Sequence, residues 1–424
     1  MTQSTDHSLR SSLSQELHAR PFAALSAPGS TAYLAFLPEN TTRDKDAEYR
    51  HLAALLNHYN VPAPPKCITH WSGQIGKHYL KWESHSEFVS FTLFGEGETQ
   101  TWFDPGTFAA FPDDWLADSP GALIASVVIQ VTVRPVDDGI SQEAATWLHR
   151  DSLAISRMLD DSLVVASDFQ IDSSGHARFV VFARPQTDRH RIGRVVQRLC
   201  EVETYKTLAM LGFVQARDMA PDIYRLEQTL TDLVSRLGSS TISPADTLHE
   251  LLSVSGTLEH LIARASYRFS ATRAYDAIVT QRIQILREQR FEGKQTFGEF
   301  MMRRYEPSIR TAQSTEARLM ALIERAGRAA DLLRTRVDVE RSEASQGLLS
   351  SMNQRADTQL RLQQTVEGLS VVAISYYALN LALYLCVPLA EYWHIAKSWL
   401  GAACTLPVVL VVWFLIRRIR RKFH

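Results

Sequence analysis

Short apolar runs separated by turn residues fill residues 30–185. Several of these runs are rich in β-branched and aromatic residues, which predicts strands. The predicted strands are STAYLAFL, KCITHWSG, KHYLKWES, EFVSFTLFG, GALIASVVIQVTV, DSLVVASDF and ARFVVFAR. DAEYRHLAALLNHYN and QEAATWLHRDSLAISRML are predicted helices, and IDSSGHARFVVF is a predicted hairpin that turns at Ser174 and Gly175. The pattern predicts a mixed N-terminal α/β domain over residues 1–186, in a protein of the α+β class.

Apolar residues recur every three or four positions from Asp188 to Glu367, which predicts long helices. The predicted helices are Arg189–Leu211, Pro221–Leu237, Ser243–Arg290 and one from Ser314 onward, with breaks at Pro221, Gly238, Pro244 and Pro307. The last helix meets no strong stop between Thr315 and Val387, and its apolar positions form a loose heptad. A helix this thinly apolar needs neighbours. Residues 187–368 are therefore expected to form a long-helix, coiled-coil-like stalk that associates with other copies.

Two uncharged stretches follow, at residues 369–389 and 400–416. A bilayer is crossed by about 20 apolar residues, with about 17 to 25 tolerated, so the two stretches predict a transmembrane hairpin over residues 369–416. The basic tail over residues 417–424 carries Arg417, Arg418, Arg420, Arg421 and Lys422. Because lysine and arginine near membrane ends stay inside, both termini are predicted to be cytoplasmic. In the alternative interpretation, the two stretches are buried helices of a soluble core.

One face of the first stretch is polar or small. At 100° per residue its members fall within an arc of about 120°; they are Ser370, Ala373, Tyr376, Tyr377, Asn380 and Tyr384. Polar side chains are costly in lipid, so this face should turn toward another helix or a wet cavity. Packing between helices and the lining of a pore are both consistent with it.

The charge balance adds to this picture. The net charge of −1 includes five positive charges in the last eight residues, which leaves −6 for residues 1–368 because Glu391 and Lys397 cancel. A weakly acidic body argues against nucleic acid as a partner. The four cysteines form no CxxC pair, which favours a reducing compartment, and the polar N-terminus lacks the apolar core of a signal peptide.

Candidate chemistry is sparse. In KHYLKWESHSEFVSF, strand periodicity would place Glu83, His85 and Glu87 on one face, where they could bind a divalent ion or transfer protons. An exposed strand face has a similar composition. His18 and Arg20 are a second candidate, and a loop that docks the N-terminus explains them equally well. The chain contains no phosphate-binding loop, GxSxG, HExxH or paired CxxC, and no cofactor is indicated.

Five motifs, spread over nearly the whole chain, carry a family resemblance. They are LHARPFAALSAP, KWESHSEF, YRFSATRAYDAIV, LLRTRVDVE and TVEGLSVVAISYYALNL. With them the chain resembles a bacterial family of predicted membrane-anchored proteins known only as a domain of unknown function. That resemblance implies no activity. The architecture is also similar to the CorA group of magnesium channels, but those proteins carry Gly-Met-Asn where this chain has Val387-Pro388-Leu389-Ala390.

These patterns together predict a multi-pass protein of the bacterial inner membrane whose body faces the cytoplasm. We expect a homo-oligomeric scaffold or regulator rather than an enzyme. The alternative is a CorA-like divalent-cation channel, in which Tyr377, Asn380 and Tyr384 line the path and Glu391 lies at its mouth. Metal-dependent chemistry at Glu83, His85 and Glu87 is a third hypothesis.

Overall fold

The computed structural model describes residues 7–11, 13–14, 22–38, 43–66, 68–98, 101–134, 136–236, 243–392 and 397–423. The chain divides into two compact units. The first contains residues 1–240 and 249–330, and the second contains residues 241–248 and 331–424. His18 and Arg20 lie outside the described residues. The domain boundaries predicted from the sequence stay predictions.

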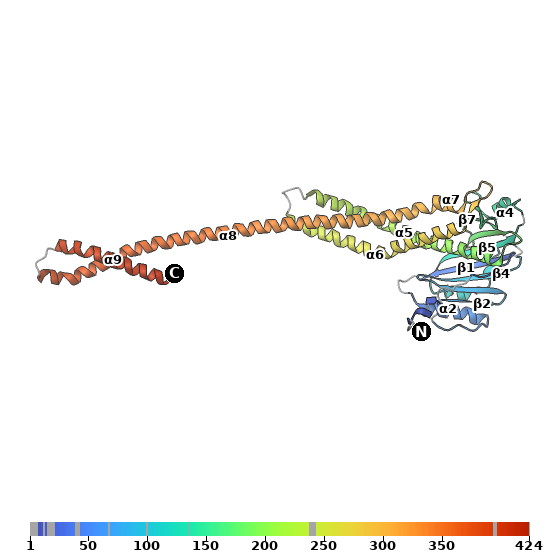
Figure 1. Ribbon diagram of the computed structural model, residues 1–424, viewed down its shortest axis with the longest axis horizontal. Coiled ribbons are helices and arrows are strands. Elements are labelled where there is room, and N and C mark those ends of the chain that lie inside the picture. Colours follow the sequence, from blue (N-terminus) through green and yellow to red (C-terminus); the bar gives the residue numbers. More distant parts are fainter. Residues whose placement is uncertain are drawn as a thin grey trace, which may run out of the picture. The chain divides into compact units, whose positions relative to one another are not determined.

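A sheet organises the first unit, and the described residues supply nine strands to it (Figure 1). Its spatial order is β2-β3-β4-β1-β5-β8-β7-β6-β9. The strands are β1 (Gly29–Leu37), β2 (His70–Ile75), β3 (His78–Ser84), β4 (Val89–Glu96), β5 (Ala122–Val133), β6 (Ala154–Met158), β7 (Leu163–Ile171), β8 (Ala177–Ala183) and β9 (Gln289–Arg290). Neighbours pair antiparallel except β5 and β8, which run parallel. The predicted hairpin at Ser174 and Gly175 is confirmed, since Ile171 pairs with Ala177 across it.

The two faces of the sheet bury different partners because successive strand residues point to opposite sides. On β1, Tyr33 and Ala35 belong to a core shared with α5 (Arg189–Arg236) and α7 (Phe297–Arg304). Leu34 and Phe36 on the same strand belong to a core shared with α2 (Lys45–His58) and α3 (Asp113–Ala117). A third cluster, on β6, β7 and β8, is covered by α4 (Ile140–Trp147). The sheet is thus covered on both sides, as its continuous apolar strands require.

Long helices extend from the sheet. α6 (Pro244–Ile285) and α8 (Glu306–Tyr392) run beside α5 (Figure 1). Two ion pairs tie them together, Arg318 with Glu227 between α8 and α5, and Arg273 with Glu316 between α6 and α8. Pro307 lies in the first turn of α8, where a missing N–H costs no helical hydrogen bond. The predicted break there is confirmed.

Two predicted elements are wrong. Pro221 lies inside α5 and does not end it, because the neighbouring Met219 and Ile223 are fully buried and packing holds the helix together. QEAATWLHRDSLAISRML is helical only in its first part, within α4, and its end forms β6, where Ile155 pairs with Ala166. The short apolar run at its end fits a helix and a strand alike until a partner strand is present.

The second unit contains the part of α8 from Asp331 onward and the helix α9 (Lys397–Phe423). The predicted helix without a stop from Thr315 to Val387 is confirmed within α8. α9 contains residues 400–416 and continues through most of the basic tail. The α+β class, with an N-terminal sheet domain, long helices and a C-terminal helix pair, is therefore confirmed.

Three histidines, of which His51 is buried and His78 and His176 are half-buried, make the stability of the sheet domain dependent on pH. Burial lowers the pKa of His51, His78 and His176, so their neutral forms are favoured in the folded chain. The unfolded chain binds the extra protons, near the ordinary histidine pKa of about 6.5. Their stabilising contribution is present above that pH and decreases as the pH falls through it.

We therefore expect the midpoint temperature of thermal unfolding to decrease as the pH is lowered from 7 to 5. The decrease should be smaller in the His51→Gln variant, because one of the three histidines is then absent. Fluorescence-detected unfolding across this range measures both effects. A midpoint of the unaltered protein that does not change over the range would contradict the prediction.

Candidate functional site

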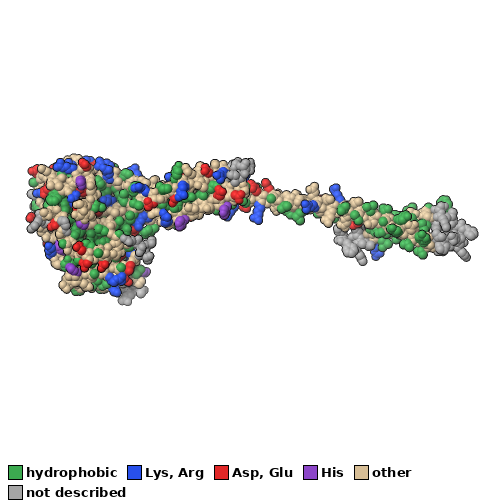
Figure 2. Space-filling model, turned by 180° about the vertical axis from the view of Figure 1, so that it is seen from behind, with side chains coloured by type: hydrophobic (Ala, Val, Ile, Leu, Met, Phe, Trp, Pro, Cys, Tyr) green, Lys and Arg blue, Asp and Glu red, His purple; other side chains and the backbone are tan. Residues whose placement is uncertain are grey.

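The α8–α9 pair exposes an apolar surface. Both helices contain a segment long and apolar enough to cross a membrane, and only 6% of each segment is buried. Large side chains along both helices are exposed, among them Leu385 at 73%, Leu406 at 71% and Phe414 at 61%. Figure 2 shows the resulting concentration of hydrophobic side chains on this pair. A helix of a soluble core would bury most of this surface instead.

One face of α8 packs toward α9. The residues on this face recur at helical spacing, and each is buried or half-buried. They are Val371, Ser375, Ala378, Ala382 and Cys386. Small residues let two helices approach closely in an apolar environment. The thiols of Cys386 and Cys404 lie within hydrogen-bonding reach of each other across the pair. At the other end, a groove of about 530 Å³ is lined by Val371, Trp413 and Arg417, among others.

The predicted polar face of α8 lies away from α9. Tyr377 is 69% exposed and Tyr384 is 80% exposed, whereas Asn380 is half-buried. The structure thus brings the three residues to one side of α8, as the spacing predicts, but gives them no partner helix among the described residues. The side chain of Glu391, near the end of α8, lies outside the described residues.

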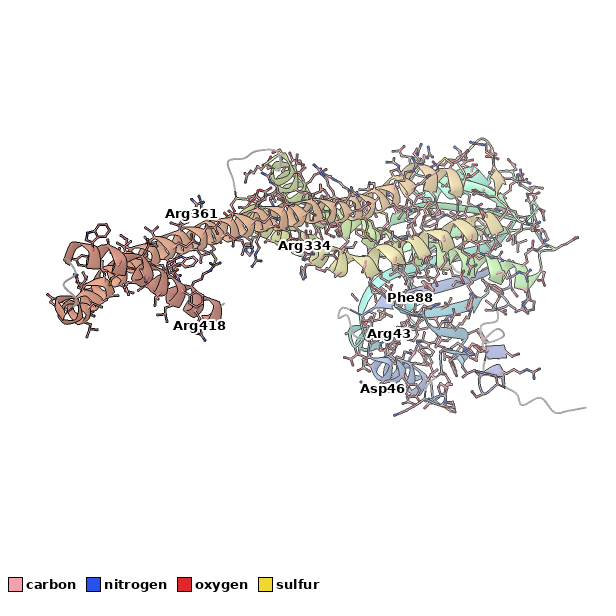
Figure 3. All side chains as sticks on the ribbon, turned by 60° about the vertical axis from the view of Figure 1, so that its left-hand side comes forward. Arg43, Asp46, Phe88, Arg334, Arg361 and Arg418 are labelled. Carbon is pink, nitrogen blue, oxygen red and sulfur yellow. The ribbon has the colours of Figure 1, made fainter. Side chains whose placement is uncertain are left out.

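The basic end of α9 contains the residues that predict membrane orientation. The guanidinium of Arg417 lies 4.9 Å from the centre of the Trp413 ring, a cation–π contact one helical turn apart. Arg418 is exposed on the same helix (Figure 3). Arg420, Arg421 and Lys422 follow within α9, and their side chains lie outside the described residues. Tryptophan and arginine together are typical of a membrane interface.

Glu83, His85 and Glu87 do not share a strand face. β3 ends at Ser84, and residues 85–88 form the turn into β4. Arg43 holds this turn, because its guanidinium donates hydrogen bonds to the carbonyl oxygens of His85 and Phe88 and pairs with Glu48 (Figure 3). The strand periodicity assumed from the sequence therefore stops one residue before His85.

Each of the three side chains has its own partner. Glu87 accepts a 2.9 Å hydrogen bond from Arg268 of α6, and the ring of His85 stacks on Phe88 at 4.1 Å. Glu83 is paired with Lys81. In the part of the chain that the structure describes, no group of three or more His, Cys, Asp or Glu side chains could hold a metal ion. The hypothesis of metal-dependent chemistry at these residues gains no support.

Glu83 belongs to a buried ion pair between the sheet and α5. Its carboxylate lies 3.2 Å from the ammonium group of Lys81, which also donates a 2.9 Å hydrogen bond to Gln197. Lys81 is 4% exposed and Glu83 is 6% exposed. Two charges removed from water in this way are tolerated only when they are paired and hydrogen-bonded. The pair has the burial expected of a structural element.

Sequence reasoning missed a cleft of about 430 Å³ between α2 and α3, lined by Arg50, His51, Trp115 and Asp118 among others. His51 stacks on Trp115 at 4.0 Å, and its Nε2 atom lies 2.9 Å from the carbonyl oxygen of Trp115. These two residues are far apart in the chain, so no spacing rule could have brought them together. Arg43, which organises the turn after β3, was missed for the same reason.

The fold and the helix pair define a class of protein, in which a sheet domain with long helices is followed by two helices with apolar, exposed surfaces. The chain belongs to the family described as protein of unknown function (DUF3422), whose model matches residues 5–423. This confirms the resemblance to an uncharacterised family. A comparison with curated proteins found no match. No finding supports the resemblance to the CorA group.

Proposed function

We propose that this protein is anchored in the bacterial inner membrane by α8 and α9 and holds its sheet domain at the cytoplasmic surface as a scaffold or regulator. The exposed apolar surface of the helix pair carries the proposal. In water, a patch of this extent would drive aggregation, whereas in lipid it needs no protein partner.

The basic end of α9 supports the proposed orientation. Five positive charges follow residue 416, whereas residues 390–399, between the two uncharged stretches, contain a single lysine or arginine, Lys397. Because positive residues are retained on the cytoplasmic side, the proposed orientation has the end of α9 inside, and with two crossings the sheet domain would face the cytoplasm as well. The buried Lys81–Glu83 pair gives these two residues a structural role within the sheet domain of the proposed scaffold.

Membrane extraction tests the anchor. The full chain should stay in the pellet after washing with alkaline carbonate and should enter the supernatant only with detergent. A chain that ends at residue 368 should be released and should still bind any partner of the scaffold. Recovery of the full chain in the supernatant without detergent would contradict the proposal.

A reporter tests the orientation. The reporter is a fluorescent protein that matures only in the cytoplasm. Fused after His424, it should be fluorescent. The matched variant replaces Arg417, Arg418, Arg420 and Arg421 by alanine, and its fluorescence should fall because the orientation signal is lost. An unaltered fusion that is not fluorescent, together with activity of an alkaline phosphatase fused at the same position, which is active only outside the cytoplasm, would overturn the orientation.

A further inference from the structure

A single stripe of side chains runs along α8 through both of its environments. Its members fall within an arc of about 80° at 100° per residue. In the part before the apolar segment they are Leu348, Met352, Leu362 and Val366, and within the apolar segment they are Tyr377, Asn380 and Tyr384. We call this set the α8 stripe.

The first half of the α8 stripe has no cover. Every residue from Asp338 to Val366 is exposed, and Leu348, Met352 and Leu362 are each more than 60% exposed. A helix in water gains most of its stability by packing an apolar face, and an isolated helix is only marginally stable. Four large apolar side chains on one side of a bare helix therefore indicate a missing partner.

The second half of the α8 stripe has the opposite polarity. Within the segment proposed to cross the membrane, its members are two tyrosines and an asparagine, surrounded by leucine, valine and isoleucine. Polar groups in lipid are stabilised by facing another helix. Arg355 and Gln359 fall within the same arc before the apolar segment, and Ser370 and Ala373 fall within it near the start of that segment. Apart from Arg355 and Gln359, the stripe is apolar where its surroundings are water, and it is polar or small where they are lipid. In both places the polarity of the stripe differs from that of the surrounding water or lipid. Such a difference is typical of a surface that packs against another helix.

α9 does not cover this stripe. The residues of α8 that face α9, such as Ser375 and Ala382, lie about 160° around the helix from it. Ser375 is 8% exposed, whereas Tyr384 is 80% exposed. Earlier in α8 the same side of the helix is buried where α5 and α6 run beside it, at Ala312, Leu319 and Ala326. By helical spacing alone, the positions of the α8 stripe repeat those of these three packed residues.

We infer that the α8 stripe packs against the α8 stripe of a second copy of this chain, with the two helices parallel. This inference rests on the proposed function, since anchoring in one membrane gives all copies the same direction. A partner must change from apolar to polar at the same depth. A second copy satisfies this requirement by identity, because its own stripe changes between Val366 and Tyr377 at the same level.

The charges around the stripe permit this pairing. Between Leu348 and Val366 the charged residues are Arg355, Asp357 and Arg361. Asp357 and Arg361 lie on the far side of the helix, so only Arg355 falls within the stripe. Two parallel copies would place their Arg355 side chains near each other. Repulsion between these two like charges would weaken the association of the two helices. Arg355→Leu should therefore strengthen the association.

Disulfide trapping tests the inference in native membranes. The starting protein is the full chain with its four cysteines replaced, which removes the contact between Cys386 and Cys404 within one chain. Single cysteines at Leu362 and Leu360 form a matched pair, because these residues are 66% and 55% exposed but lie on different sides of α8. Oxidation should yield cross-linked dimers several-fold more efficiently from Leu362→Cys than from Leu360→Cys, and Tyr377→Cys should extend the result into lipid.

Equal trapping at Leu360 and Leu362, or trapping of Leu362→Cys only to other proteins, would overturn the inference. A second measurement does not depend on oxidation: in detergent, Leu362→Asp should shift the complex to the monomer, and Arg355→Leu should shift it to the dimer. Each variant is also washed with carbonate. An unaltered protein that is monomeric in detergent but stays in the membrane after the wash contradicts only the pairing of α8 stripes, whereas protein that appears in the supernatant contradicts the membrane anchor itself.

Discussion

Lys81→Met is expected to lower the free energy of unfolding of the sheet domain by about 3–5 kcal/mol, the usual cost of removing one partner of a buried ion pair. Methionine fills a similar volume but leaves the Glu83 carboxylate, 6% exposed, without its ammonium partner. The oxygen of Gln197 loses its donor as well. Denaturant unfolding of the full chain in detergent, followed by tryptophan fluorescence, measures the change.

The double variant Lys81→Met, Glu83→Leu provides the control. It removes both charges and leaves none uncompensated, and apolar replacements of buried pairs are often neutral. Most of the lost stability should therefore return. If the double variant were less stable than Lys81→Met alone, the pair would not be the source of the effect.

Gly193→Ala is expected to cost about 1–3 kcal/mol, the range for forcing extra atoms into a packed core. Gly193 lies in the second turn of α5, where the backbone of Ala23 and Leu25 lies against the helix. A Cβ atom at this position would lie 1.8 Å from the carbonyl oxygen of Ala23. The clash is with a backbone atom, so no change of rotamer relieves it. The segment that contains Ala23 and the buried Leu25 must therefore move.

Gly256→Ala is the matched control for this substitution. Gly256 lies in α6, and a Cβ atom there would meet nothing within 4 Å. Alanine is preferred over glycine in a helix by about 0.5–1 kcal/mol, so this variant should gain stability. Thermal unfolding of the two variants side by side should show shifts of opposite sign. A Gly193→Ala protein as stable as the parent would contradict the close contact with Ala23.

Much of the fold could be predicted from local patterns. β1, β4, β5 and β8 were recognised because runs of β-branched and aromatic residues end at turn residues, and these rules act within a few positions. β6 and β9 were missed because a short strand is decided by its partner. β9 has two residues and pairs with β6 from far along the chain. Pro221 was misread because the packing of α5 outweighs its local preference.

The candidate site divides in the same way. The apolar segments and the polar side of α8 follow from composition and helical spacing. The sequence could not show which side of α8 meets α9, because that depends on Ser375 and Ala382 finding a second helix. It also could not show that Glu87 is paired with Arg268, or that Arg43 holds the turn that contains His85.

The two edge strands of the sheet affect how readily neighbouring copies of the sheet domain could pair with one another. An exposed edge strand is a template on which a neighbouring molecule can add a strand, and short or interrupted edges reduce that risk. Here one edge is the two-residue β9, and the other is the six-residue β2, which Gly73 weakens because glycine has no side chain to pack. Sheet domains held close together on a membrane would therefore find little to extend, and crowding need not lead to aggregation.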